Sequence, residues 1–390
     1  MKTAIHGDVA GRFDNVREAF AMAFEGNPDM GASLAIVHRG ELVVDLWGGV
    51  ADYRDRSPWQ PDTPSVIFSC TKGLVSILAA RLVQDGLLDY EAPVSRYWRE
   101  FAQAGKHNVR VKHLLSHRSG LSAPRKDLTT EDILQWDSVA ELLADQEPLW
   151  VPDSGYAYHA ITHGWLIGEV IRRVTGVSVG KYFRDLIAEP LKVDAWIGLP
   201  KEPASRVAHM LVGPTLSQLL EQQAAALKPN AVDWPTRAST LGGALPPALI
   251  GEDSGFNDPR IQSAEIPGAG GIATARAIAT IWSATFENSH GASLLSPETI
   301  REATTVQTEG PPVFDTPGPW PRWGMGFQLD SETRRFVTQG GYGHDGAGGQ
   351  VAFADPAEEV GFAFLTSQME GVGDVRGTRI VDALRTALAS

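Results

Sequence analysis

Residues 68–78 read FSCTKGLVSIL, and the apolar positions Leu74 and Ile77 recur at the spacing of an α-helix. The pattern predicts a helix that begins near Ser69. Residues three positions apart lie on the same face of a helix, so the amine of Lys72 can reach the hydroxyl of Ser69. The segment therefore indicates a serine with a base beside it at the tip of a helix.

A serine hydroxyl is a weak nucleophile unless a neighbouring group takes its proton. A lysine amine can do this only when burial or positive neighbours lower its pKa, which is ordinarily ~10.4. The helix N-terminus helps, because its dipole disfavours a cation and its free N–H groups can bind an oxyanion. The same residues also fit a serine N-cap followed by a solvated lysine, since S-x-x-K occurs by chance in many chains. Further residues must support the catalytic interpretation.

Two tyrosines occur in the sequence YAYH at residues 156–159. A phenol beside Ser69 and Lys72 could carry a proton to a leaving group, and we choose Tyr158 over Tyr156 for this role. Both tyrosines also fit the commoner arrangement of half-buried aromatic side chains at the entry of a helix.

A glycine-rich stretch, GGYGHDGAGG, occupies residues 340–349 directly before a predicted strand at 350–354. Glycine lets the backbone pass close to a ligand, and a strand edge offers N–H groups to an anionic intermediate. Alone, the stretch is also compatible with a flexible turn.

The flanking segments predict an α/β fold. Runs of β-forming residues at 32–38 and 41–48 surround a turn and indicate an antiparallel hairpin, and residues 351–366 repeat that pattern. Helical patterns near both termini predict helices that flank this sheet. We therefore expect an α/β domain from residues 1–70 and 265–390, with a large, mostly helical subdomain inserted at 71–264.

Composition limits the classes of function. With 34 basic and 47 acidic side chains the formal charge is −13, which repels nucleic-acid phosphates and anionic membranes. The single cysteine, Cys70, excludes intramolecular disulfides and multi-cysteine metal sites. No segment approaches the ~20 apolar residues of a membrane helix, and residues 1–16 lack the apolar region of an export signal. We expect a cytoplasmic protein that acts on a small molecule without a cofactor or metal; its oligomeric state is left open.

Three separated motifs resemble, in this order, those of the serine β-lactamase and penicillin-binding protein superfamily: Ser69-x-x-Lys72, Tyr158 and His344-Asp345-Gly346. The similarity is greatest to its class C-like branch of family VIII carboxylesterases. Supporting stretches lie at 113–121, 267–274 and 344–356, and the resemblance spans about residues 32–366.

The resemblance implies a β-lactamase-like fold and an acyl-enzyme mechanism. Ser69 would attack an acyl carbonyl, and the backbone N–H groups of Ser69 and Ala347 would form the oxyanion hole. Lys72 and Tyr158 would move the protons, and which of them takes the first proton is left open. Water would then hydrolyse the acyl-enzyme.

Two departures from the family pattern concern the substrate. Lactamases of the superfamily usually have a lysine at the position of His344, where its charge holds the carboxylate of a β-lactam, and a mostly neutral histidine holds that group less well. They usually have an asparagine at the position of Ala160. With Gly346, these positions would bind substrate, and both changes favour small neutral esters over β-lactams.

Three alternatives to a carboxylesterase remain. An acyltransferase or amidohydrolase would use the same nucleophile, and a β-lactamase or peptidase is a further option. A binding module that has lost its chemistry is disfavoured, because Lys72 and Tyr158 are both present.

Other motifs are weaker. Residues 176–180, GVSVG, match the G-x-S-x-G pattern, but helices are predicted on both sides, so Ser178 fits a helix N-cap better than a nucleophile. His159 and His163 have the spacing of a helical metal pair, yet Ala160 replaces the glutamate of the metalloprotease motif. The pair Gly180-Lys181 lacks the Ser or Thr of a phosphate loop.

Overall fold

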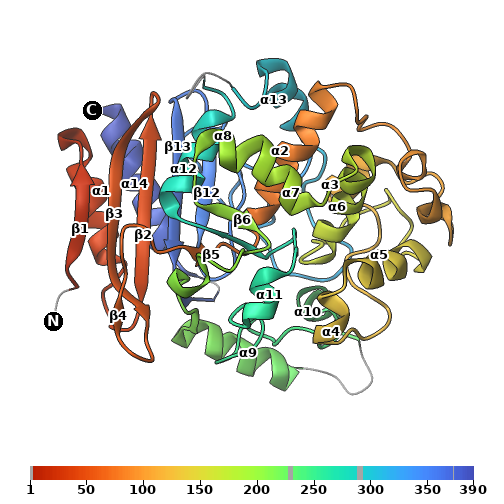
Figure 1. Ribbon diagram of the computed structural model, residues 1–390, viewed down its shortest axis with the longest axis horizontal. Helices are drawn as coiled ribbons and strands as arrows, with labels where there is room; N and C mark the ends of the chain where they lie inside the picture. The colour runs from red at the N-terminus through yellow and green to blue at the C-terminus, as the bar shows by residue number, and fades with distance from the viewer. Residues whose placement is uncertain (1–2, 227–231, 288–292, 372) are drawn as a thin grey trace.

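A computed structural model describes residues 3–226, 232–287, 293–371 and 373–390. Within these residues, nine strands form one antiparallel sheet in the order β1-β3-β2-β13-β12-β11-β10-β9, with β4 paired to β3. Figure 1 shows this sheet on one side of the molecule. The strands are β1 (Ile5–Val9), β2 (Gly31–His38), β3 (Glu41–Asp52), β4 (Ser57–Pro58), β9 (Arg322–Trp323), β10 (Gln328–Leu329), β11 (Tyr342–Gly343), β12 (Val351–Asp355) and β13 (Val360–Thr366).

The predicted hairpins are confirmed. β2 and β3 pair from Gly31 opposite Gly49 to His38 opposite Glu41, and β12 pairs antiparallel with β13. β13 also pairs with β2 along its full length, so the two hairpins meet at the centre of the sheet. The centre therefore joins segments that lie more than 300 residues apart in the sequence.

Helices cover both faces of this sheet. On one face, α1 (Asp14–Met22) packs against α14 (Arg376–Ala389), and both bury apolar side chains against the strands. On the other face, α12 (Ala275–Ala284) packs on β13, β2 and β12. The α/β fold with an antiparallel sheet and flanking terminal helices is confirmed.

The intervening chain is mostly helical and surrounds α2 (Cys70–Gln84), which is buried on nearly all sides. A helix that is apolar all round belongs in an interior. Of the other helices, α6 (Thr162–Thr175), α7 (Val179–Phe183) and α13 (Pro297–Ala303) pack on α2. The remaining helices between α2 and α12 are α3 (Val111–Leu115), α4 (Thr130–Ile133), α5 (Trp136–Asp145), α8 (Glu189–Leu191), α9 (Pro214–Ala226), α10 (Trp234–Thr240) and α11 (Pro259–Ser263). Short 3-10 or π turns lie at η1 (Gly11–Phe13), η2 (Val94–Arg96), η3 (Arg99–Ala102), η4 (Arg184–Ala188) and η5 (Ala204–Arg206).

Two small sheets join the helical region to the rest. One has the order β5-β8-β6, formed by β5 (Ser65–Val66), β8 (Gly271–Ala273) and β6 (Ala195–Ile197). The other pairs β7 (Leu211–Val212) with β14 (Gln368–Met369). β6 and β7 are strands inside the stretch expected to be mostly helical, and each pairs with chain outside it. The division into domains at residues 70 and 265 stays a prediction.

The start of α6 packs directly on the loop at residues 267–268. A Cβ built on Gly164 would overlap the backbone nitrogen of Gly268 and come within 2.6 Å of the Pro267 carbonyl carbon. Both neighbours are backbone atoms, so no side-chain rotation relieves the overlap. Only glycine permits this close approach.

In the part of the chain described, no helix is long and apolar enough to cross a membrane.

We predict that Gly164→Ala lowers the free energy of unfolding by about 2 kcal/mol, because the added methyl group must displace backbone. Urea unfolding followed by circular dichroism measures this change. Gly11→Ala is the control, since nothing lies within 4 Å of its Cβ position, and it should shift stability by less than about 0.5 kcal/mol. Equal stabilities of the two variants would contradict the packing described.

Candidate active site

Ser69 lies at the tip of α2, where β5 turns into the helix. Phe68 has φ 43°, in the left-handed region that residues with a side chain rarely adopt. Its ring packs edge-on against Phe256, at 5.5 Å between ring centroids, and this contact holds the turn. Backbone strain of this kind collects at functional sites. The turn leaves the Ser69 side chain partly exposed, while its neighbours in α2 are buried.

Lys72 reaches Ser69 as the sequence predicted. The Nζ atom of Lys72 lies 3.0 Å from Ser69 Oγ, and it donates to the carbonyl oxygens of Ala160, at 2.5 Å, and Gly268, at 2.6 Å. The close approach of Gly164 to Gly268 brings these two carbonyls together. A lysine with three polar partners inside the protein is not the solvated residue of the simpler interpretation.

The Lys72 side chain is fully buried. Burial lowers its pKa well below the ordinary value of 10.5, and only the Cys70 thiol opposes this shift. Removing an ammonium group from water disfavours its charged form. Burial therefore favours a neutral amine beside the Ser69 hydroxyl.

Tyr158 is the tyrosine that faces this pair. Its ring centroid lies 4.9 Å from Lys72 Nζ, and its ring stacks on Trp323. Burial raises the pKa of Tyr158 above its ordinary value, partly offset by a hydrogen bond with Ser69. Tyr156 instead donates its hydroxyl to the Gly310 carbonyl, 2.6 Å away. The choice of Tyr158 over Tyr156 agrees with this geometry.

The glycine-rich stretch forms a tight turn against the Ser69 region. The Gly346 N–H donates to the Gln350 carbonyl at 2.9 Å, which closes a turn over residues 347–349. A Cβ on Gly346 would come within 2.5 Å of the Ile67 carbonyl oxygen and 3.2 Å of Cys70 Sγ. Only a residue without a side chain fits between the turn and the chain on either side of Ser69. Ala347 is thereby placed beside the tip of α2.

His344 lies in one cluster of rings with Tyr158 and Trp323. Its ring centroid is 6.1 Å from that of Tyr158 and 5.1 Å from that of Trp323, and its Nδ1 lies 2.7 Å from the Asp345 carbonyl oxygen. Burial, with a smaller contribution from Lys72, lowers the pKa of His344 to about 3. The side chain is therefore a neutral imidazole at physiological pH.

Three more histidines lie close to Tyr158 and Lys72, and the sequence analysis assigned them no catalytic role. His117 contacts the rings of Tyr158, His159 and His163 at centroid distances of 4.9, 5.5 and 5.2 Å. Burial is the main cause that lowers the pKa of each. His117 falls in the supporting stretch at 113–121, which was the one sequence signal for it.

Within the described residues, the weaker motifs of the sequence have other roles. His159 already pairs with the Ser119 hydroxyl and the Ala157 carbonyl through its two ring nitrogens. Among the residues described, no group of three or more possible ligands could hold a metal ion. Ser178 caps α7, between two helices as predicted, and donates to Glu265 at 2.6 Å.

A cavity of about 240 Å³ opens beside Tyr158 and Ala160. Its wall is rich in aromatic side chains and includes Trp234, Phe314, Trp320 and Trp323. None of the described residues that line it carries a charge. The carbonyl of Ala160 faces Lys72, so the cavity adjoins the catalytic centre.

Comparison with known proteins identifies the family. The family model described as Beta-lactamase matches residues 21–387. The chain belongs to the beta-lactamase family. It is 33% identical over 371 residues to Esterase/beta-lactamase LipL of Mycobacterium tuberculosis, covering 94% of this chain and 83% of that protein.

Solved structures are also similar to this chain over nearly its whole length. A penicillin-binding protein homologue from Caulobacter crescentus has 34% identity and a TM-score of 0.85, and the match covers 98% of this chain and 100% of that one. A family VIII carboxylesterase has 33% identity and a TM-score of 0.84, with the same coverage. The predicted family and β-lactamase-like fold are confirmed, and the protein is a serine hydrolase.

We predict that Ser69→Ala lowers ester turnover by about 10³-fold or more, because the nucleophile is lost. Ser178→Ala is the matched control. It removes a helix cap worth about 1 kcal/mol but should leave most of the turnover. Release of 4-nitrophenol from 4-nitrophenyl acetate measures both. The reverse ranking would overturn the assignment of Ser69.

The pH dependence of kcat/KM should report the ionisation of the Lys72 amine. The amine accepts a proton only when it is neutral, so activity rises with pH through its pKa; because burial lowers that pKa, the rise lies below 10.5. The raised pKa of Tyr158 keeps its phenol protonated over the same range. His344→Gln should not add or remove an inflection between about pH 5 and 8. An inflection in that range that disappears in this variant would contradict a neutral His344.

Proposed function

We propose that the protein is a carboxylesterase that hydrolyses small neutral esters through an acyl-enzyme on Ser69. The observation that carries this proposal is the set of three partners around Lys72 Nζ. A neutral amine has two N–H donors and one lone pair. The carbonyls of Ala160 and Gly268 take the two donors, which leaves the lone pair for the proton of Ser69.

The first step follows from this arrangement. Ser69 Oγ bonds to the acyl carbon while its proton moves to Lys72 Nζ, and the carbonyl oxygen becomes an oxyanion. The N–H groups of Ser69 and Ala347 would bind that oxyanion. The raised pKa of Tyr158, which keeps it a phenol at neutral pH, supports Lys72 as the first base.

Collapse of the intermediate breaks the bond to the leaving alkoxide. The hydrogen bond between Tyr158 and Ser69 supports Tyr158 as the donor of a proton to that oxygen, and Lys72 would then return a proton to Tyr158. Water then attacks the acyl-enzyme with the same groups acting in reverse. The step returns Ser69 as a hydroxyl and releases a carboxylic acid.

Uncharged surroundings favour neutral substrates. The cavity beside Tyr158 has no charged side chain among its described lining residues, and the neutral His344 offers no cation to a carboxylate. An anionic group would lose its hydration there without gaining an ion pair. Ala160 also lacks the amide that would contact an acylamino side chain. These features support esters over β-lactams.

Acyl transfer is the second candidate. The aromatic cavity favours an apolar alcohol over water as a neighbour of the acyl-enzyme. Adding an alcohol to the assay distinguishes the two, because transfer produces a new ester and hydrolysis produces acid.

We predict that 4-nitrophenyl butyrate has a kcat/KM at least about tenfold above that of 4-nitrophenyl hemisuccinate, which carries a carboxylate on a chain of similar length. The leaving group is the same, so the difference reports the acyl chain alone. His344→Lys should reduce that difference by accelerating the anionic ester. Nitrocefin turnover comparable to that of the butyrate ester would overturn the proposal.

A further inference from the structure

We infer that the first turn of α14 positions the backbone turn that carries the Ala347 N–H, through Arg376 on one side and Arg334 on the other. Both are positioning residues, since neither is placed to touch a substrate. The inference rests on the proposed function, which assigns the Ala347 N–H to the oxyanion hole.

Arg376 holds the far end of the turn. Its Nη2 donates to the carbonyls of Gly348, at 2.8 Å, and Gln368, at 3.0 Å, while its Nε and Nη2 pair with Asp374 at 2.9 and 2.7 Å. Gly348 follows Ala347 directly. The Glu370 N–H donates to the same Gly348 carbonyl at 3.3 Å. That carbonyl is therefore fixed by two donors.

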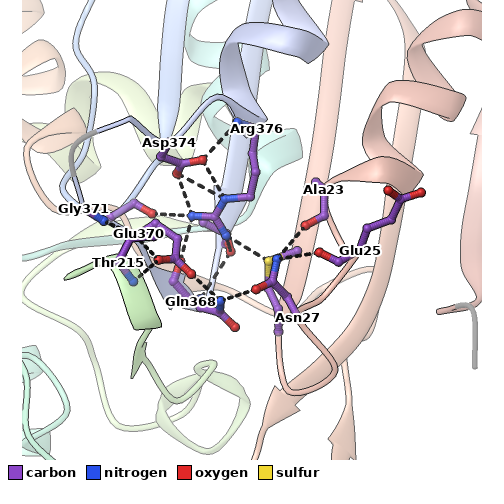
Figure 2. A network of polar contacts seen from close by, with 12 residues as sticks. Ala23, Glu25, Asn27, Thr215, Gln368, Glu370, Gly371, Asp374 and Arg376 are labelled. Atoms are coloured by element: carbon purple, nitrogen blue, oxygen red, sulfur yellow. Dashed lines mark hydrogen bonds and ion pairs between the residues drawn. The ribbon is translucent and has the colours of Figure 1, made fainter. Parts of the chain in front are cut away.

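Figure 2 shows Arg376 at the centre of a wider polar network. Its Nη1 lies 3.0 Å from Met30 Sδ, and Gln368 Nε2 donates to Asn27 Oδ1 at 2.6 Å. Glu370 accepts from Thr215 at the start of α9. The network ties the α1–β2 loop, β14 and α9 to the arginine, which limits its freedom to move.

The turn is shaped to fit this anchor. Gly348 and Gly349 have φ of 83° and 104°. A Cβ on Gly348 would come within 2.6 Å of the Met369 side chain, and one on Gly349 would overlap Asp374. The turn therefore lies in direct contact with the segment that leads into α14.

Arg334 holds the near end. Its Nε donates to Asp345 Oδ2 at 2.7 Å, and its Nη1 donates to the Thr378 hydroxyl of α14 at 3.0 Å. Burial raises the pKa of Asp345, and the charge of Arg334 opposes this shift and favours the carboxylate. The two arginines thus connect both sides of Ala347 to a single helical turn at residues 376–378.

This arrangement suits oxyanion stabilisation for a geometric reason. A donor must lie about 2.7–3.1 Å from the position that the oxyanion takes, so a small shift of the turn weakens the bond in the transition state. The guanidinium of Arg376 reaches several acceptors at once because it is planar and has five N–H donors. A lysine could keep the charge beside Asp374 but could not make the same set of bonds.

The test compares Arg376→Lys with the unaltered protein, counting active sites by fluorophosphonate titration. We expect kcat per active site to fall about tenfold or more with KM changed less than about twofold, because the loss occurs in the transition state. Phenylboronic acid is the probe of the oxyanion hole, because Ser69 Oγ bonds to its boron atom and the adduct is a tetrahedral anion. Its Ki should rise by a factor similar to the fall in kcat. A purely structural role would lower the number of active sites or the melting temperature, not these values.

Arg334→Lys is the second variant, and it decides the question if Arg376→Lys does not fold. Arg172→Lys is the control, because Arg172 also pairs with a buried carboxylate, Glu169, but belongs to α6. It should keep the kcat and Ki of the unaltered protein. If folded Arg376→Lys or Arg334→Lys keeps the kcat and Ki of the unaltered protein per active site, the inference is overturned but the proposed function is not. Failure of the unaltered protein to hydrolyse esters would overturn the proposed function, and the inference with it.

Discussion

Burial of the Lys72 amine is the constraint on which the other features of the site depend. Three separate segments must converge on one nitrogen: the tip of α2 supplies the Ser69 hydroxyl, and the chain before α6 and the loop before β8 each supply a carbonyl. Taking a lysine out of water is costly unless the group becomes neutral. The packing of two backbone segments therefore favours a neutral amine at a residue that is ordinarily a cation, as the proposed role of Lys72 as a base requires. The aromatic and histidine side chains around it keep water away without adding charge.

The chemistry of this centre depends on dipoles and neutral groups. Lys72 is favoured as an amine, Tyr158 is a phenol and His344 is a neutral imidazole, each because burial disfavours its ionised form. A negative charge that develops during acyl transfer would then be stabilised mainly by backbone N–H groups, whose effect is strong in a dry site. Stabilisation of that charge would therefore depend on the position of the turn that carries the Ala347 N–H. For this reason Arg376 and Arg334, which lie outside the pocket, would affect the reaction.

The sequence predicts the parts of the site that side chains encode. The three-residue spacing of Ser69 and Lys72 follows from helix geometry, and the hairpins of the sheet follow from alternation and turn residues. The two carbonyls that hold Lys72 were not predictable, because every residue has a carbonyl and only the folded chain selects those of Ala160 and Gly268. β6 was missed for a related reason: it has three residues, and its pairing with β8 depends on a partner far along the chain. The hydrogen bond from Arg376 to the Gly348 carbonyl was likewise not predictable from the sequence, since its acceptor is a backbone atom.

The pairing of β2 with β13 determines how much of the chain must be synthesised before the central sheet can form. Residue 366 must have left the ribosome before the central strands can meet, and the start of α14 must follow before the turn at Ala347 has its anchors. Long-range strand pairing of this kind is slow to form. If Ser69 is the nucleophile that we propose, a growing polypeptide that already contains Ser69, Lys72 and Tyr158 would therefore be inactive. Ser69 would become reactive only after nearly all of the described chain has been synthesised.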